Sequence, residues 1–525
     1  MVTRSAAAIL GAGLIAIALA VFPHKAFELD RYFVAKELVL HVVALLCLIL
    51  VLVPHRTVKV DAADKLMAAF LIWSALSAVF ATNHWLAQRA LALSVSSAVV
   101  FWASRRLGAE GMHRRILVAA AVATVVAAMT GLLQAYGLEL DYFSENRAPG
   151  GTFGNRNFVA HFCALGLPAL VYVTVTARTT NGALLGSLSC GAVTALLVLS
   201  RSRASWLAAA ASLATLIVVG FASRKYWRQL PVARRFGRIG LTAAVAGVAA
   251  MFIPNTLNWR SDSPYLETAL RVIDYSSGSG RGRVAQYVNS MRMAADDPLL
   301  GVGPGNWPVG YVRFAPQNDP SLTDDGMTAN PWPSGDWAAF MSERGPIGAL
   351  ALMGVFVLLA LTSIRRWREL MDSDAVLAKV TLAGTLVATL VVSAFDAVLL
   401  LGAPALLVWS VVGAASGVAR GGQEITIPRG AWWITMTVLV FVQATSVARS
   451  AMQSVAVSIV GNDASRGGWT LAAAWDPGSY RINLRAAELQ ARSGRCNVAR
   501  VHARRARDLF PHAHAPRRIL RECGG

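Results

Sequence analysis

The chain has 525 residues, of which 55% are hydrophobic and only 15% are charged. Soluble domains usually carry about 25% charged residues, so this composition excludes an ordinary soluble globular protein. The formal net charge of +20 raises the question of a nucleic-acid partner, and the distribution of the basic residues answers it.

Apolar runs recur along most of the chain. A helix needs roughly 17–25 apolar residues to cross a bilayer, and about thirteen runs approach that length. We therefore predict an all-α polytopic membrane protein. The first run lacks a clear small-x-small cleavage site before Phe22-Pro23, so we expect it to be retained rather than removed as a signal peptide. The predicted spans are 6–22, 37–53, 64–81, 87–104, 116–136, 158–177, 182–199, 204–222, 239–254, 346–364, 377–398, 402–419 and 430–448.

The basic residues separate the loops into two sets. With the N-terminus inside, 21 Lys and Arg residues fall in the inside loops and 8 in the short outside loops. This asymmetry follows the positive-inside rule, so much of the basic excess reflects topology and needs no nucleic acid. The same count predicts that residues 137–157, the turn 201–203, the polar segment 255–344 and the tail after residue 449 lie outside.

These boundaries divide the chain into four predicted parts. Residues 1–254 hold the first nine spans and residues 345–449 the last four. Between them, residues 255–344 form a large water-facing loop domain, and residues 450–525 form a small helical tail. The loop domain is the only long polar segment between spans, so chemistry on soluble or surface-held substrates is expected to use it.

The five cysteines agree with this map. Cys47, Cys163 and Cys190 fall within spans, where cysteine behaves as a small apolar residue. Cys496 and Cys523 lie in the tail, where an oxidising compartment would allow a disulfide between them. No CxxC or His/Cys pattern predicts a metal site, and no cofactor is expected.

The tail carries a repeat-like pattern. Pro477 and Pro511 lie 34 residues apart, and the residues between them suit two short helices that meet at Gly494. This arrangement resembles a tetratricopeptide unit, whose period is 34 residues. The alternative is a solvated basic helical hairpin, because residues 450–525 hold 12 Lys or Arg against 5 acids.

Three basic clusters are predicted on the outer face. The first contains Arg156 in GGTFGNRNFVAHF, the second Arg201 and Arg203 in SRSRASW, and the third Arg281 and Arg283 in GSGRGRVAQY. Guanidinium groups are always charged and bind phosphate oxygens bidentately. Several arginines at an outer membrane face therefore favour a lipid diphosphate ligand. The alternative is that they only anchor helices at lipid phosphates.

Four stretches together carry a resemblance to a known family. They occur in the family's order around the large outer loop, and the third, which ends in DDPLLGVGPGNW, is the most specific. On these motifs the chain resembles the O-antigen ligase and O-antigen polymerase superfamily, which includes bacterial O-linked oligosaccharyltransferases. The stretches are GTFGNRNFVA at 151–160, SRSRASWL at 200–207, RVAQYVNSMRMAADDPLLGVGPGNW at 283–307 and SGDWAAFMSERGPIG at 334–348.

The resemblance implies a function in the bacterial inner membrane. Such proteins transfer a glycan from undecaprenyl diphosphate to an acceptor hydroxyl at the periplasmic face, in O-antigen or exopolysaccharide assembly, and ligase members need no metal. Carried over by position, Arg203 or Arg201 and Arg283 would hold the diphosphate, with Arg156 and Arg281 as weaker candidates. The acceptor would be a glycan, a lipid or a protein.

One departure from the family concerns the acceptor base. The family usually carries a histidine nine residues before the Glu of its ExG turn, and here that position is Ser334. Asp336 is the best candidate base, provided that burial raises its pKa from about 4, and Glu343 is the second, although its position implies a structural role. His161 could face outside from the end of its span. The missing histidine favours polymerase-like or divergent members over ligases proper.

Tryptophans in the loop domain are candidates for sugar stacking, namely Trp307, Trp332 and Trp337. The alternative is an interfacial aromatic belt, in which tryptophan is enriched. Acids outnumber arginines ten to seven over residues 255–344, which suits neutral sugar hydroxyls better than a polyanion.

Two other functions make different demands on the sequence. A flippase or transporter for lipid-linked glycans would place charged residues near the midplane of the spans, and the predicted spans are nearly free of them apart from Asp396 near one end. A catalytically inactive scaffold would bind the carrier lipid and recruit polysaccharide-assembly proteins through the tail. The absent histidine is the feature that supports this scaffold.

Overall fold

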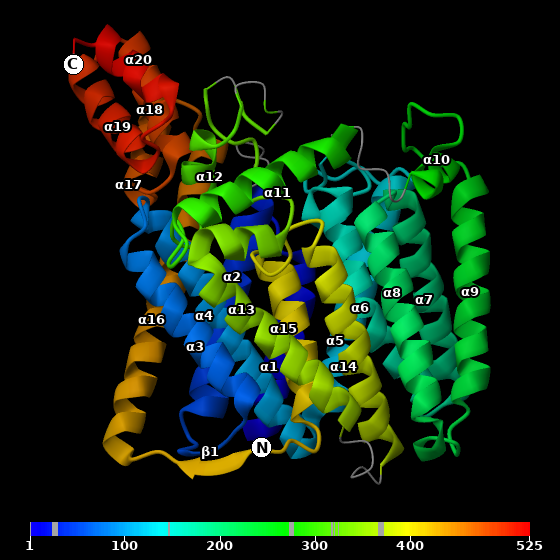
Figure 1. The fold of residues 1–525 in the computed structure, drawn as a ribbon. Helices are drawn as coiled ribbons and strands as arrows, with labels where there is room; N and C mark the ends of the chain where they lie inside the picture. Colours follow the sequence, from blue (N-terminus) through cyan, green and yellow to red (C-terminus); the bar gives the residue numbers. More distant parts are fainter. Residues whose placement is uncertain are drawn as a thin grey trace.

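The computed structural model is an α-helical membrane bundle with extra-membranous helices at one end (Figure 1). It describes residues 2–23, 30–144, 147–271, 278–316, 319, 321–323, 325–365 and 372–524. Within these ranges, 11 helical segments are long and apolar enough to cross a membrane. One of them, His84–Ala135, is interrupted at Gly111, whose φ is 79°, so α4 and α5 are separate helices. The prediction of an all-α polytopic membrane protein is confirmed.

Among the described residues, the first half of the chain supplies nine long helices. Several begin at polar caps, which satisfy backbone N–H groups that have no partner inside the helix. Asp61 forms a capping box with Asp64 at the start of α3, and Asn83 caps α4 by accepting the N–H of Leu86. The elements are α1 Val2–Leu19, α2 Asp30–Cys47, η1 Leu48–Leu52, β1 Thr57–Val60, α3 Ala62–Val79, α4 His84–Leu107, η2 Gly108–Met112, α5 His113–Ala135, η3 Gly151–Phe153, α6 Arg156–Val175, α7 Thr180–Ser200, α8 Arg203–Ala222, η4 Arg224–Tyr226 and α9 Val232–Phe252.

The second half contains the loop domain, the remaining membrane helices and the tail. Within α13 the backbone is not helical at Gly345, whose φ is 67°, directly before Pro346. A short segment, 336–344, therefore precedes the part of α13 that enters the bundle. The elements are α10 Pro264–Leu270, α11 Gly278–Asp296, α12 Trp307–Gly310, η5 Tyr311–Arg313, α13 Asp336–Arg365, α14 Ser373–Ser393, α15 Gly402–Gly417, β2 Gln423–Thr426, α16 Arg429–Asn462, α17 Arg466–Trp475, α18 Tyr480–Arg492, α19 Cys496–Leu509 and α20 His514–Glu522.

The core of the bundle lies around α15. Every one of its 16 residues is buried, although it is shorter than the other membrane helices. Small residues allow α4 to approach closely, because a Cβ atom on Gly413 or Gly417 would collide with the backbone carbonyls of Phe101 and Arg105. Such small-residue contacts are the usual way in which membrane helices pack.

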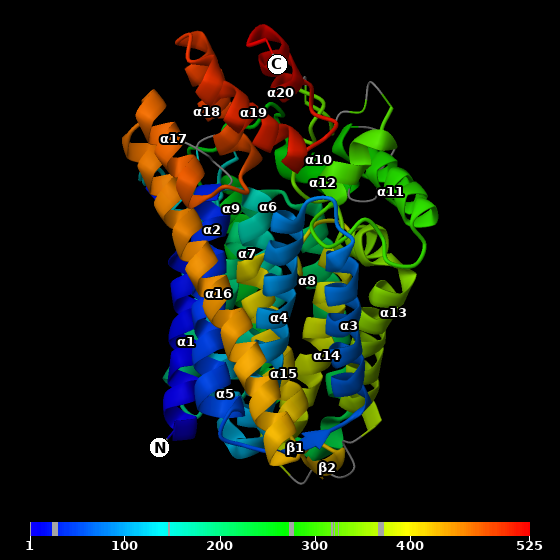
Figure 2. The same ribbon diagram turned by 90° about the vertical axis from the view of Figure 1, so that its left-hand side faces the viewer.

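A two-stranded ribbon joins the two halves of the bundle. Strands β1 and β2 pair antiparallel, with Thr57 opposite Thr426. Beside the ribbon, Arg105 bonds Asp61 and Asp64 at 2.5 and 2.8 Å, and Arg420 also pairs with Asp64. In Figure 2, α16 runs from this ribbon along the whole bundle to the tail.

The extra-membranous elements gather at one end. Figures 1 and 2 place α10, α11, α12 and the tail at the end opposite to the start of α1 and to the ribbon. We call this end the loop end, and the other the N-terminal end. The arrangement agrees with the predicted grouping of residues 137–157, 201–203, 255–344 and the tail on one side.

The tail is a set of short antiparallel helices. Helices α18 and α19 meet at Gly494, whose φ is 70°, as the sequence predicted. A disulfide joins Cys496 at the start of α19 to Cys523 after α20. Its small core includes Trp469, Ile482 and the alanines between them. The identity of this hairpin as a tetratricopeptide unit stays a prediction.

Candidate functional site

Two parallel helices begin side by side at the loop end. The chain enters α6 through a tight turn in which Gly151 and Gly154 have φ values of 50° and 69°, and a side chain on Gly154 would collide with the ring of Tyr32. The Asn155 side chain caps α6 by accepting the N–H of Asn157 at 2.9 Å. Arg156 and Arg203 are the first residues of α6 and α8. Helix N-termini carry partial positive charge and are ready-made anion sites.

Arg156 and Arg201 are brought together by one aromatic ring. Each guanidinium lies 4.8 Å from the centre of the Trp259 ring, which is within the range of cation–π contacts. Arg201 has a φ of 52°, a strained conformation for a residue other than glycine. Its Nε donates to Thr268 at 2.8 Å, and its Nη2 lies 3.5 Å from Glu267.

Arg203 completes this group. Its Nη1 donates to the carbonyl oxygen of Arg271 at 2.7 Å, directly after α10. Arg201 and Arg203 therefore both bind the α10 segment. We call Arg156, Arg201, Arg203 and Trp259 the arginine region. It joins two of the three basic clusters predicted from the sequence.

The third cluster lies on α11 beside a different part of α6. Arg281 is exposed and Arg283 is half-buried. Arg283 lies within electrostatic range of His161, whose Nδ1 is 3.9 Å from a carboxylate oxygen of Asp396. His161 is only 1% exposed, so it does not face outward as expected. The five residues from Arg156 to His161 rise roughly 7.5 Å along an α-helix.

Asp336 is held by the backbone of a following loop. Its side chain is fully buried, and its two oxygens accept the N–H groups of Val398, Leu399 and Leu400 at 2.9–3.3 Å. These hydrogen bonds to the Asp336 carboxylate fix the position of the loop that carries Asp396. At the position of the missing histidine, the N–H of Ser334 donates to Gln286 of α11 at 2.8 Å.

Glu343 anchors the loop domain to the bundle. Its carboxylate accepts the N–H of Trp307 at 3.3 Å and pairs with Arg344 at 3.3 Å. Its backbone carbonyl accepts the N–H of Gly303 and the hydroxyl of Ser77. These contacts hold the GVGPGNW turn, which agrees with the structural role that its position implied.

Two of the predicted sugar-stacking tryptophans are packing residues. Trp307 is 0% exposed; it packs on Tyr311, and its Nε1 donates to Ser290 at 2.8 Å. This finding corrects the prediction, since a fully buried indole cannot stack on a sugar or join an interfacial belt. Trp337 is partly buried against Phe340 and Phe356. Trp332, in contrast, packs edge-on against Phe33 and lines a large cleft.

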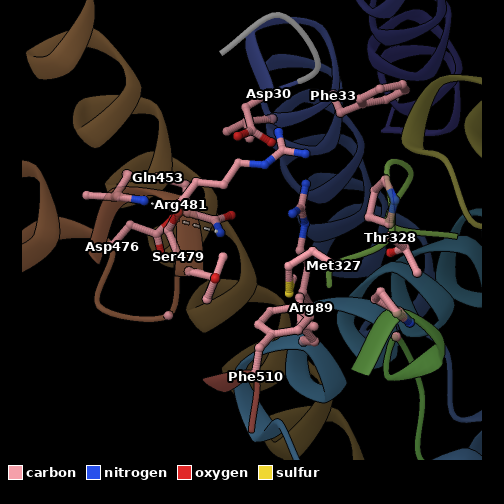
Figure 3. A pocket seen from close by; sticks show the side chains of 18 of the residues that line it. Asp30, Phe33, Arg89, Met327, Thr328, Gln453, Asp476, Ser479, Arg481 and Phe510 are labelled. Carbon is pink, nitrogen blue, oxygen red and sulfur yellow. Dashed lines mark hydrogen bonds between the residues drawn. The ribbon is translucent and has the colours of Figure 1, made fainter. Parts of the chain in front are cut away.

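That cleft lies between the bundle and the tail (Figure 3). Its volume of about 760 Å³ is within the usual range of ligand pockets, roughly 300–1,000 Å³. Its walls come from α2, α4, α16, the loop before α13 and the start of α18. We call it the tail cleft. Phe33 also lines a smaller cavity that contains His161, so one aromatic side chain separates the two spaces.

Charged residues at the cleft were missed in the sequence analysis. Glu37 accepts two hydrogen bonds from Arg89, at 2.8 and 2.9 Å. Deeper in the bundle, His41 contacts Ser96 at 2.7 Å, and Ser96 donates to Gln443 at 2.9 Å. The expectation of spans nearly free of such groups was therefore too strong. Long-range pairing of these isolated residues leaves no local sequence signal.

Comparison with known protein families identifies a match that includes most of the arginines described above. Residues 188–331 match the family model described as O-antigen ligase. This part of the chain is therefore similar to the O-antigen ligase family and supports the predicted resemblance to the O-antigen ligase and polymerase superfamily. No curated protein matches the chain.

The matched O-antigen ligase domain covers four of the five arginines predicted to bind the diphosphate. It begins within α7 and includes Arg201, Arg203, Arg281 and Arg283, together with the GVGPGNW turn. Arg156 and Asp336 lie outside it. The domain supports glycan transfer of the O-antigen ligase or polymerase type by a membrane glycosyltransferase-like enzyme. Lipid-linked glycans and membrane lipids are the substrates that this superfamily implies in general.

Proposed function

We propose that the protein transfers a glycan from an undecaprenyl-diphosphate donor to an acceptor hydroxyl at the periplasmic face of the inner membrane. The observation that carries the proposal is the arginine region at the joint N-termini of α6 and α8. Three guanidinium groups and two helix dipoles at a membrane face provide the charge that a lipid diphosphate requires.

The reaction follows from the chemistry of the donor. The acceptor oxygen attacks the anomeric carbon, the bond between that carbon and the diphosphate oxygen breaks, and undecaprenyl diphosphate leaves with the bonding electrons. Arg203 and Arg283 stabilise the negative charge that develops on the leaving group, with Arg156 and Arg201 holding the diphosphate. Preorganised cationic groups of this kind are usually the largest contribution to catalysis.

A base must accept the proton of the acceptor hydroxyl, and we assign this role to His161. Its ring nitrogen faces Asp396 and lies within electrostatic range of Arg283. Histidine is the side chain most often used as a general base, and the Asp396 carboxylate, 3.9 Å from the ring nitrogen, favours the protonated form electrostatically. Asp336 is then a positioning residue, because its oxygens hold residues 398–400 next to Asp396.

A reconstituted assay tests this function. Purified protein in lipid nanodiscs would receive the lipid-linked oligosaccharide and the acceptor fraction of the source cells, and released undecaprenyl diphosphate and glycosylated product would be measured. Product formation that depends on Arg283 supports transfer. Binding of undecaprenyl diphosphate without transfer to any acceptor would instead identify a scaffold, and movement of intact lipid-linked glycan across the membrane would identify a flippase.

A further inference from the structure

The tail cleft is built by segments far apart in the sequence. Asp30 and Phe33 come from α2, Arg89 from α4, Gln453 from α16 and Arg481 from α18. Figure 3 shows the side chains of Arg89 and Arg481 extending into the middle of the cleft from different walls. Without the tail, the cleft would be an open surface of the bundle.

The described residues give the cleft a small excess of acidic groups. Six carboxylates and four guanidinium groups line it. Two pairs are internal, because Arg89 binds Glu37 at 2.8 Å and Arg485 binds Glu488 at 3.0 Å. A site for a phosphate-rich ligand would carry an excess of cations, as the arginine region does. The cleft therefore favours an uncharged, polar ligand.

Four side chains that line the cleft have a buried polar atom that lacks a hydrogen-bond partner among the residues that the structure describes. The atoms are the Nε of Arg449, the Oγ1 of Thr328, the Oε1 of Gln453 and the hydroxyl of Tyr480. The last three belong to side chains that are less than 9% exposed. Buried polar atoms are nearly always hydrogen-bonded, so three such atoms on three separate walls indicate a ligand with several hydroxyl groups. Burial raises the pKa of the Tyr480 hydroxyl, which keeps it protonated as a donor.

Aromatic surfaces accompany these polar atoms. Trp332 lines the cleft from the loop before α13. Tyr480 and Phe510 pack edge-on in the tail, with ring centres 5.0 Å apart, and both line the same space. A sugar ring presents hydroxyls at its edge and C–H groups on its faces, so it needs both kinds of surface, and ligand pockets commonly combine apolar walls with a few placed polar groups.

We propose that the tail and the bundle together form a binding cleft for a neutral, hydroxyl-rich oligosaccharide. This inference rests on the proposed glycan transfer and adds a glycan site to it, separate from the arginine region. The ligand is the glycan of either the acceptor or the lipid-linked donor. Phe33 places the cleft next to the cavity of His161.

The test measures oligosaccharide binding by the full-length protein in nanodiscs. The probe is the neutral oligosaccharide fraction released by mild acid from the surface polysaccharide of the source cells, titrated by calorimetry. Tyr480→Phe combined with Thr328→Val removes two hydroxyls at nearly constant volume and is expected to weaken binding at least tenfold. The matched control, Tyr226→Phe with Thr435→Val, changes residues remote from the cleft and should leave binding unchanged.

Undecaprenyl diphosphate serves as a second probe. Its binding should be lost in Arg156→Gln and kept in the Tyr480→Phe, Thr328→Val variant. Failure of the wild-type protein to bind the oligosaccharide, or equal binding by both double variants, would overturn the cleft assignment. Failure of the wild-type protein to bind undecaprenyl diphosphate would instead overturn the donor site. The two proposals therefore fail in different measurements.

Competition identifies which glycan the cleft holds. Lipid-linked oligosaccharide that displaces the free oligosaccharide would assign the cleft to the donor glycan. Simultaneous binding of both would assign it to the acceptor glycan. Both results require the free oligosaccharide to bind in the cleft, and both support the proposal.

Discussion

The arginine region and the tail cleft lie at the same end of the molecule but differ in how they are built. Arg201 and Arg203 are two residues apart in the sequence, and α6 and α8 supply their positive N-termini directly. The tail cleft combines Phe33, Arg89, Gln453 and Tyr480, which come from opposite ends of the chain. The proposed diphosphate site therefore depends on local charge, whereas the proposed oligosaccharide site depends on positions that only the fold defines.

The largest effect is expected at Arg283. Arg283→Ala removes the cation that we propose to stabilise the leaving group, and loss of one such stabilising group typically lowers kcat by about 10²–10³. Arg281→Ala is the matched control, since Arg281 lies on the same helix but is exposed. Initial rates of undecaprenyl diphosphate release measure both. Equal rates for the two variants would remove Arg283 from the site.

The second expectation separates His161 from Asp336. General-base catalysis contributes typically 10²–10⁴-fold, so His161→Gln should lower kcat about a hundredfold or more while leaving KM for the donor little changed. Asp336→Asn keeps one carbonyl oxygen for the N–H groups of residues 398–400 and should lower kcat less. A larger loss in Asp336→Asn, with an altered pH profile, would return the role of base to Asp336.

The disulfide tests whether the cleft depends on the tail. Cys496 and Cys523 close a loop of 27 residues, and cross-links of this length contribute roughly 2–4 kcal/mol of stability. The double Cys→Ser variant should therefore expose the tail amides to faster hydrogen exchange and weaken oligosaccharide binding. Binding of undecaprenyl diphosphate should stay the same. A parallel loss of both would show that the two sites are not independent.

The smallest effect is expected at Trp259. Cation–π contacts at exposed sites contribute about 0.5–1 kcal/mol each, and Trp259→Leu removes two of them. Binding of undecaprenyl diphosphate should weaken by roughly tenfold, and oligosaccharide binding should not change. Wild-type affinity for the diphosphate in this variant would show that the ring does not organise Arg156 and Arg201.

The sequence predicted features that are local. Apolar length predicted the membrane helices, short motifs predicted the arginines, and the expected compartment allowed the disulfide between Cys496 and Cys523 that the structure contains. The structure added what depends on distant contacts. Asp336 accepts N–H groups more than sixty residues away, a partnership that no motif reveals. The sequence of an aromatic-rich segment also does not show which of its side chains are buried. Trp307 and Trp332 were equal candidates for sugar stacking, but Trp307 lies in the core and Trp332 lines the cleft.

The length of α16 has a consequence for the geometry of glycan recognition. Its 34 residues extend roughly 51 Å at 1.5 Å per residue, while the hydrocarbon core of a bilayer is about 30 Å thick. One unbroken helix therefore connects the β1–β2 ribbon to the tail and rises well beyond the lipid. Each residue turns an α-helix by about 100°. The number of residues in α16 therefore determines which face of the tail is directed toward α2 and α4. Insertion or deletion of a single residue in α16 after Arg449 would rotate Tyr480 away from the bundle without altering any contact inside the membrane.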